Sequence, residues 1–280
     1  TLPSFINFGK LRASYGVVGT SPEIYSANIL YAKQSIQTVD GSVPYLSTNS
    51  TYGNNLIKPE NKYELEFGLE TRMIDNKIGL DLTYFNSRIV DQIIPLQLPS
   101  STGATSILAN VGELRSNGVE IGLNITPIDR AVRWDARINF ATVMTKAHSL
   151  IDGVDELAMP GQPIDGGALK IVTEVGEPLG NIYTKPRATD ENGNFIINDN
   201  GLYTLSDEYT KSGNILPKAT GGIANTVSYK GFSFDLLIDY RFGGQIVSSP
   251  LHYATGAGMY ESTMEYRDEA NGGIPYYVDN

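Results

Sequence analysis

Along much of this chain, apolar and polar side chains occupy alternate positions. The clearest case covers residues 62–73, where the apolar set is Tyr63, Leu65, Phe67, Leu69 and Met73. The positions between them carry Lys62, Glu64, Glu66, Glu70 and Arg72. A period of two places successive side chains on opposite faces of a β-strand, whereas a helix would mix the two sets around its circumference. The stretch therefore predicts a strand with one apolar face and one charged face.

The same period recurs at residues 10–17, 78–85, 119–126, 133–140, 221–230 and 232–242, so about seven strands are expected. Short links fall at residues 74–77, 127–132 and 230–231, and Asp75-Asn76 and Lys230-Gly231 are residue pairs typical of hairpin turns. Long links fall near residues 19–61, 91–116, 148–220 and 243–280. Strict alternation of tight periplasmic turns with long extracellular loops is typical of outer-membrane β-barrels.

The length of the predicted strands points the same way. They run to about 10–12 residues, whereas strands of soluble proteins have a mode of about 5–6. Eleven residues extend over roughly 36 Å, and a tilt of about 45° projects this onto the roughly 25 Å apolar band of such barrels. We predict an all-β, antiparallel transmembrane β-barrel to which residues 1–280 contribute one partial domain. Seven strands cannot close a barrel with every backbone group paired, so the closing strands are expected outside this stretch.

The charged face must then meet water or a polar plug inside the barrel. An Arg or Lys in mid-bilayer costs about 2–4 kcal/mol, and several such residues on one strand approach the whole stability of a domain, about 5–15 kcal/mol. The candidate lumen-facing residues are Glu64, Glu66, Glu70, Arg72, Asp81, Glu120, Arg137, Asp235, Asp239 and Arg241.

Composition narrows the function further. The net charge of −10 disfavours nucleic acid as a partner, and the absence of cysteine rules out a disulfide scaffold and a cysteine nucleophile. Glu64, Glu66 and Glu70 share one strand face, on which residues two apart lie about 7 Å from each other, a separation that would suit a pair of catalytic carboxylates. Charged rows recur on other strands without a special partner, however, so a hydrated wall is favoured. No catalytic motif is found, and we expect no enzyme activity.

Five stretches carry a more specific signal. They are FGKLRASYG at residues 8–16, NLIKPE at 55–60 leading into the strand at 62–73, ANVGELRSNGVE at 109–120, GEPLG at 176–180, and residues 217–232 ending in NTVSYKGF. In this order they resemble the SusC/RagA family of TonB-dependent outer-membrane transporters. The resemblance implies a 22-stranded barrel with an N-terminal plug through which TonB acts. The plug and the remaining strands are expected outside residues 1–280. It also implies a SusD-like surface lipoprotein as lid, an oligosaccharide or peptide cargo, and a Bacteroidetes-type outer membrane.

The long links contain further candidates. Exposed tyrosines could contact a ligand or the lid, or could pack loop against loop; these are Tyr25, Tyr31, Tyr45, Tyr52, Tyr253 and Tyr260. Oxygen ligands suited to a structural Ca²⁺ are offered by Asp190, Asn192, Asn194 and Asp199. Their spacing departs from the EF-hand pattern, so a plain Asn/Gly turn is favoured and no cofactor is expected. The alternative function is a soluble or surface-attached β-rich carbohydrate-binding module.

Overall fold

The computed structural model describes residues 3–159, 165–199 and 203–263, and it contains two compact units, Thr1–Gly244 and Gln245–Asn280. The first unit is built almost wholly from strands. In the second unit, the described part holds a short helix, α1 (Ser249–Gly256), and a 3-10 turn at Glu261–Thr263. Within the described ranges, no helix combines the length and the apolar character needed to cross a membrane.

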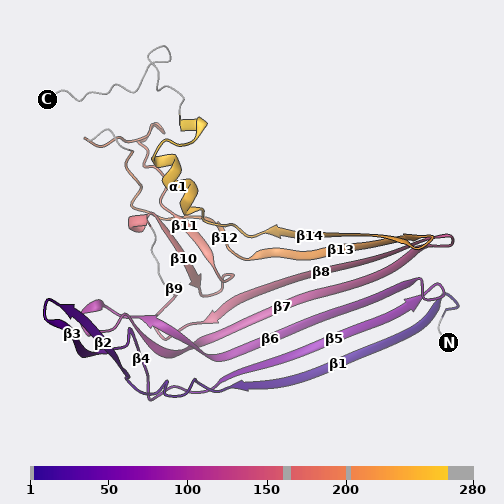
Figure 1. The fold of residues 1–280 in the computed structure, drawn as a ribbon, viewed down its shortest axis with the longest axis horizontal. Coiled ribbons are helices and arrows are strands. Elements are labelled where there is room, and N and C mark those ends of the chain that lie inside the picture. The colour runs from indigo at the N-terminus through magenta and orange to yellow at the C-terminus, as the bar shows by residue number, and fades with distance from the viewer. Residues whose placement is uncertain (1–2, 160–164, 200–202, 264–280) are drawn as a thin grey trace, which may run out of the picture. The chain divides into compact units, whose positions relative to one another are not determined.

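Seven long antiparallel strands form the main sheet, as the alternation predicts. They are β1 (Ile6–Thr20), β5 (Glu60–Met73), β6 (Ile78–Gln97), β7 (Ser106–Asp129), β8 (Val132–Ser149), β13 (Pro217–Tyr229) and β14 (Phe232–Gly243). They lie side by side in the order β1-β5-β6-β7-β8-β13-β14 (Figure 1). An eighth member, the two-residue strand β4 (Thr51–Tyr52), pairs in parallel with the start of β7.

The three short links are tight hairpin turns. Residues 74–77 join β5 to β6, residues 130–131 join β7 to β8, and residues 230–231 join β13 to β14. Lys230 and Gly231 both adopt positive φ, 46° and 86°, as the favoured two-residue hairpin turns require. The link predicted at residues 127–132 is shorter in the structure, because Ile128 and Asp129 still pair with Trp134 and Arg133 beyond a register shift.

The link predicted at residues 91–116 is wrong in extent. Pairing between β6 and β7 continues to Gln97 and Ser106, so only residues 98–105 form the connection. Asp91 and Gly112 lie opposite each other with φ of 56° and 51°, and the ladder resumes beyond them in the same register. β7 therefore has 24 residues rather than the expected 10–12.

The other two long links of the first unit also contain strands. Residues 21–59 include a hairpin of β2 (Tyr31–Thr38) and β3 (Gly41–Thr48). Residues 150–216 contain a four-stranded sheet in the order β12-β11-β10-β9, built from Thr210–Asn214, Asn181–Thr184, Leu169–Glu174 and Glu156–Ala158. This small sheet is attached to the end of β8 by backbone hydrogen bonds from Gly176 N to Ala147 O and from Leu179 N to Thr145 O.

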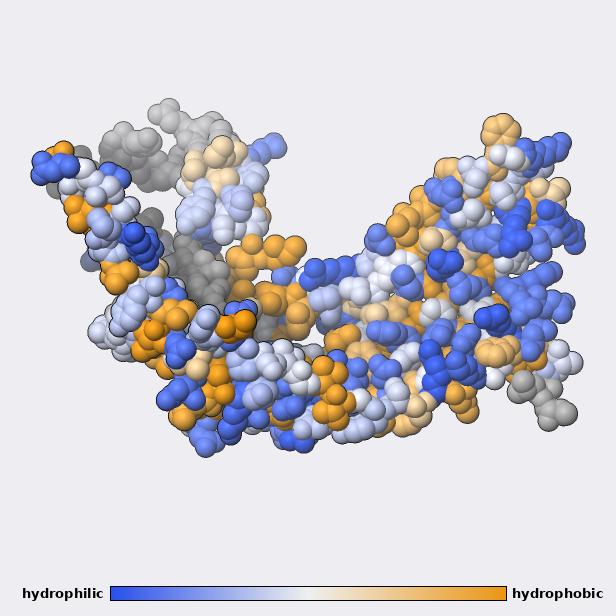
Figure 2. Space-filling view, turned by 60° about the horizontal axis from the view of Figure 1, so that its bottom comes forward, coloured by the Kyte–Doolittle hydropathy of each residue, from blue (hydrophilic) through white to orange (hydrophobic). Residues whose placement is uncertain are grey.

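The apolar face of the main sheet lies open. The side chains of Leu65, Phe67 and Phe234 are 39%, 50% and 64% exposed, and Figure 2 shows hydrophobic side chains reaching the surface among hydrophilic ones. The accessible surface is 19850 Å², whereas a globular protein of this mass exposes roughly 11,800 Å². In a soluble sandwich these residues would pack against a second sheet, so the structure does not have that architecture.

Candidate functional site

The register gathers all ten charged residues predicted from the sequence on one face of the main sheet, called here the polar face. Glu70 pairs with Asp81, Glu120 with Thr83, and Arg137 with Asn124. Asp235, Asp239 and Arg241 on β14 pair with Thr226, Gly222 and Thr220 of β13. Between these pairs the ladders are continuous, so the period of two carries one face across seven strands.

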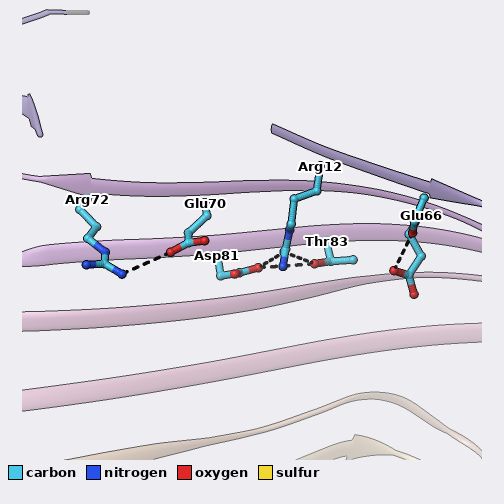
Figure 3. A network of polar contacts seen from close by, with 7 residues as sticks. Arg12, Glu66, Glu70, Arg72, Asp81 and Thr83 are labelled. Atoms are coloured by element: carbon cyan, nitrogen blue, oxygen red, sulfur yellow. Dashed lines mark hydrogen bonds and ion pairs between the residues drawn. The ribbon is translucent and has the colours of Figure 1, made fainter. Parts of the chain in front are cut away.

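Charged side chains on the polar face contact one another across strands (Figure 3). Arg12 on β1 donates from Nη2 to Asp81 Oδ1 on β6 at 2.7 Å and to Thr83 Oγ1 at 3.2 Å. To do so it crosses Gly68 of β5, where a Cβ atom would lie 2.6 Å from Arg12 Nε. The glycine in the alternating stretch of β5 thus leaves room for an ion pair between strands that are not neighbours.

Two more contacts extend this network along β5. Arg72 Nη2 lies 3.5 Å from Glu70 Oε1, and the Ser14 hydroxyl donates to Glu66 Oε2 at 3.3 Å (Figure 3). The ion pair of Arg12 with Asp81 is 41% and 44% exposed at its two side chains. Exposed ion pairs of this kind contribute about 0–1 kcal/mol, so the network does not account for the stability of the sheet.

Small residues hollow the polar face beside this network. A hollow of about 460 Å³ is lined by Thr83, Glu120, Asn139, Thr220 and neighbouring residues on the four strands β6, β7, β8 and β13. Gly122 and Gly221 contribute no side chain to its lining. In the described part of the chain, the Glu120 carboxylate has no hydrogen bond or ion pair.

The calcium candidate is a hydrogen-bonded turn. The Asp190 carboxylate accepts from the backbone N–H groups of Asn192 and Asn194 at 2.8 Å each, and from the Asn194 side-chain amide at 3.0 Å. These bonds, led by that of the Asn194 side chain, lower the pKa of Asp190. Asp199 lies beyond Ile197, which pairs with Tyr203. Among the described residues, no group of three or more His, Cys, Asp or Glu side chains is placed to hold a metal ion.

The candidate tyrosines of the first unit do not form one surface. Tyr31 and Tyr45 are exposed but lie on opposite faces of the β2–β3 hairpin, because Tyr45 pairs with Gln34. Tyr52 is half-buried, and its hydroxyl donates to the Thr102 carbonyl at 3.3 Å, which is loop-to-loop packing. Tyr25 is exposed, and Tyr253 and Tyr260 are exposed within the second unit.

Two clusters were missed at the level of sequence. On β6 and β7, Glu113 forms ion pairs with Arg88 and Arg115 at 2.7 and 2.6 Å. The spacing of Glu113 and Arg115 by two residues in one strand was the available signal, since such residues share a face. Their partner Arg88 lies on another strand, in a stretch that the alternation did not cover.

The second missed cluster is the interior of the four-stranded sheet. Glu174 accepts from Asn181 Nδ2 and from the Tyr183 hydroxyl, both at 2.9 Å. Burial, followed by the hydrogen bond to Glu174, raises the pKa of Tyr183 to about 12. Asn181 is 1% exposed and Val172 is fully buried, so this long link folds around its own small core.

Comparisons with known proteins agree with this architecture. Residues 4–273 match the family model described as TonB dependent receptor-like, beta-barrel. The TonB-dependent receptor P3 of Formosa agariphila is 28% identical over 91% of this chain and 28% of its own length. The TonB-dependent receptor P39 of the same organism is 24% identical over 86% of this chain and 27% of its own length. This chain therefore spans about a quarter of the length of the curated relatives it matches.

Solved structures show the same fold. A structure of the RagAB peptide transporter superposes with a TM-score of 0.67 at 22% identity, covering 86% of this chain and 27% of that one. The closed-closed state of the RagAB peptide importer gives a TM-score of 0.68 at 22% identity, over 87% and 27% of the two chains. With the family model matching nearly the whole sequence and the sheet matching a solved relative, this chain belongs to the TonB dependent receptor-like β-barrel family.

Proposed function

We propose that residues 1–280 form part of the wall of a TonB-dependent outer-membrane importer of oligosaccharides or peptides, of the SusC/RagA type. The observation that carries the proposal is the division of one open sheet into two faces. The apolar face carries exposed Phe67 and Phe234, and the polar face carries ten charged residues. A single sheet with such faces fits a wall between hydrocarbon and water.

In this proposal the polar face lines the lumen. The opposite orientation would place Glu64, Glu66, Glu70 and Arg72 of one strand against lipid. Even at the low end of about 2 kcal/mol for an arginine, with less for each carboxylate, the sum for β5 alone approaches the net stability of a domain. The network of Arg12 and Asp81 and the hollow at Glu120 then face water, a plug or passing cargo.

Partners and cargo follow from the family and are part of the same proposal. TonB acts through a plug domain outside residues 1–280, and a SusD-like lipoprotein covers the extracellular side. The links after β1, β6 and β8 provide the surface toward that lid, with exposed Tyr31 and Tyr45 as contact residues. The likeness of the sheet to that of the RagAB peptide transporter supports peptide as one cargo class. The whole protein transports and binds without catalysing a reaction.

Cysteine labelling tests the two faces. Residues 1–280 contain no cysteine, so the Asp239→Cys and Ile238→Cys variants of the full-length protein each add one thiol to this segment. The two positions are neighbours on β14 but lie on opposite faces. A charged, water-soluble maleimide is expected to label the Asp239→Cys variant. The Ile238→Cys variant should resist that reagent, and a bimane probe attached to it in denaturant and refolded should be quenched by nitroxide lipids.

Equal labelling of both thiols by the water-soluble reagent would contradict a lipid-facing sheet and would favour a water-soluble module.

The tyrosine contacts have a separate test. Tyr45→Ala is expected to weaken binding of the lid protein, whereas Tyr52→Ala, which removes a packing contact to Thr102, serves as the matched control. Unchanged lid affinity in the Tyr45→Ala variant would remove this tyrosine from the interface.

A further inference from the structure

Three basic side chains form one row on the apolar side of the main sheet. Arg88 on β6 pairs with Arg115 on β7, and Arg115 pairs with Lys146 on β8. The ladders are unbroken from this row to Tyr84, Val119 and Thr142. These residues lie four positions along each strand, so the basic row and these residues lie on the same side of the sheet. The face that exposes Phe67 and Tyr84 therefore ends, toward the long links, in three positive charges.

The height of the basic row above the tight turns matches the edge of a membrane. On β6 the apolar side contains Ile78, Leu80, Leu82 and Tyr84, then Asn86, then Arg88. Arg88 lies ten positions beyond Ile78. At about 3.3 Å per residue and a tilt of about 45°, this stretch covers roughly 23 Å along the membrane normal. The apolar band of outer-membrane barrels is about 25 Å tall, so the row falls at its outer boundary.

The arginines are held in place while remaining accessible. Glu113, which is 8% exposed, contacts Arg88 Nη2 at 2.7 Å and Arg115 Nε at 2.6 Å. Both arginine side chains stay 54% exposed. A guanidinium carries five N–H donors, so each retains donors for another anion.

The charge around the row is positive. Arg88, Arg115 and Lys146 against Glu113 leave a surplus of two positive charges. The nearby pair of Lys211 and Glu177, whose atoms lie 2.8 Å apart, leaves that surplus unchanged. The chain as a whole has a net charge of −10, so this patch is opposite in sign to the average surface.

We propose that the basic row binds phosphate groups on the headgroups of outer-leaflet lipid, and this inference rests on the proposed membrane-spanning function. Guanidinium groups match phosphate geometry with paired N–H···O bonds, and basic residues at the membrane surface attract anionic headgroups. The occupant is a lipid rather than a free anion because the row continues directly into the exposed apolar side of the sheet. One molecule with acyl chains and a phosphate would contact both surfaces.

The test measures binding of diphosphoryl lipid A to the full-length protein in detergent micelles, with dephosphorylated lipid A as the comparison ligand. Wild-type protein should bind the phosphorylated lipid more tightly. Lys146→Gln should lower that affinity about five-fold, and Lys146→Gln with Arg115→Gln about 25-fold, from the typical worth of one basic residue at a charged membrane surface. Lys62→Gln is the matched control, because Lys62 lies on the polar side of β5 and pairs with Ile89.

Equal affinity for the two lipids, or an equal loss in the Lys62→Gln variant, would overturn the inference. So would full displacement of lipid A by millimolar inorganic phosphate, which would indicate a soluble-anion site. Lys146→Gln alone disturbs no hydrogen bond to Glu113, so it remains decisive where Arg115→Gln impairs folding. The cysteine labelling separates the two proposals. If only the Asp239→Cys thiol is labelled but lipid A binding shows no phosphate preference, this inference alone is wrong. If both thiols are labelled equally, the membrane-spanning function itself is wrong.

Discussion

A charge placed on either side of one strand provides a direct test of the two faces. Phe140 and Asn139 are neighbours on β8, and their register partners assign them to opposite faces. Phe140 pairs with Ile121 and Gly221, on the apolar side, whereas Asn139 pairs with Gly122 and Gly222 on the polar side. We consider Phe140→Arg against the matched change Asn139→Arg.

The position of Phe140 determines the size of the effect. It lies six residues from Trp134, near the tight turns, and six residues from Lys146 in the basic row, so it occupies the middle of the apolar band. The transfer cost of an arginine there is about 2–4 kcal/mol, before any loss of the aromatic ring is counted. This corresponds to a roughly 30- to 700-fold shift of the folding equilibrium. Asn139 lines the hollow, near the carboxylates of Asp81 and Glu120, so an arginine there should change stability by less than about 0.5 kcal/mol.

The assay is reversible unfolding of the full-length protein in lipid vesicles, followed by the change in electrophoretic mobility of unheated samples across a urea series. Phe140→Arg should move the midpoint to lower urea, and Asn139→Arg should leave it near the wild-type value. Phe140→Leu controls for the lost ring volume. Equal destabilisation by the two arginines, or a larger effect at Asn139, would refute the assignment of the faces to lipid and water.

Three further outcomes are expected. Gly112→Ala should destabilise the protein by at least about 1–3 kcal/mol, because φ is 51° and the new Cβ would lie 1.9 Å from Ser149 O. Gly79→Ala is the control, since its Cβ would meet nothing nearer than 3.8 Å. Thermal unfolding and proteolysis of the 98–105 connection measure the stability of both variants. The small sheet should lose stability between pH 10 and pH 12, because its folded form keeps Tyr183 protonated above the pH at which an unfolded tyrosine ionises. In an absorbance titration at high pH, the late tyrosine ionisation should be missing from a Tyr183→Phe variant. Asp190→Ala should loosen its turn. Calorimetric titration with Ca²⁺ should give the same baseline heat for wild type and variant, since N–H donors already occupy the carboxylate. A binding isotherm that is present in the wild type and lost in the variant would refute this.

The sequence predicts best those strands in which both faces constrain the residue type, with apolar side chains on one face and charged side chains on the other. β14 was expected at 232–242 and spans Phe232–Gly243, and the stretch at 62–73 lies within β5, Glu60–Met73. In such stretches a slip of one residue exchanges the two faces, so pattern and pairing constrain each other. The ten charged residues of the polar face could be grouped from parity alone for the same reason.

Other parts of the structure could not be read from parity. The upper part of β6 contains Ile93, Ile94 and Leu96, which include both parities, so the pairing that continues to Gln97 leaves no alternating pattern. The contact of Arg12 with Asp81 depends on an intervening glycine, and the interior of the four-stranded sheet joins strands of three to six residues across distant parts of the chain. Backbone pairing between short distant segments is set by tertiary context, which no local period records.

The location of the register irregularities also supports the proposed function. Shifts occur between Ile6 and Phe8, between Glu113 and Leu114, between Ile125 and Ile128, and between Pro217 and Ala219, all toward the ends of the paired segments. Through the middle of the sheet each ladder is continuous. A shift there would transfer a run of charges on one side of the shift to the apolar face, at a cost of several kcal/mol in lipid. The irregularities leave a band about ten residues long between them. Their confinement to its two borders is what a wall between hydrocarbon and water requires.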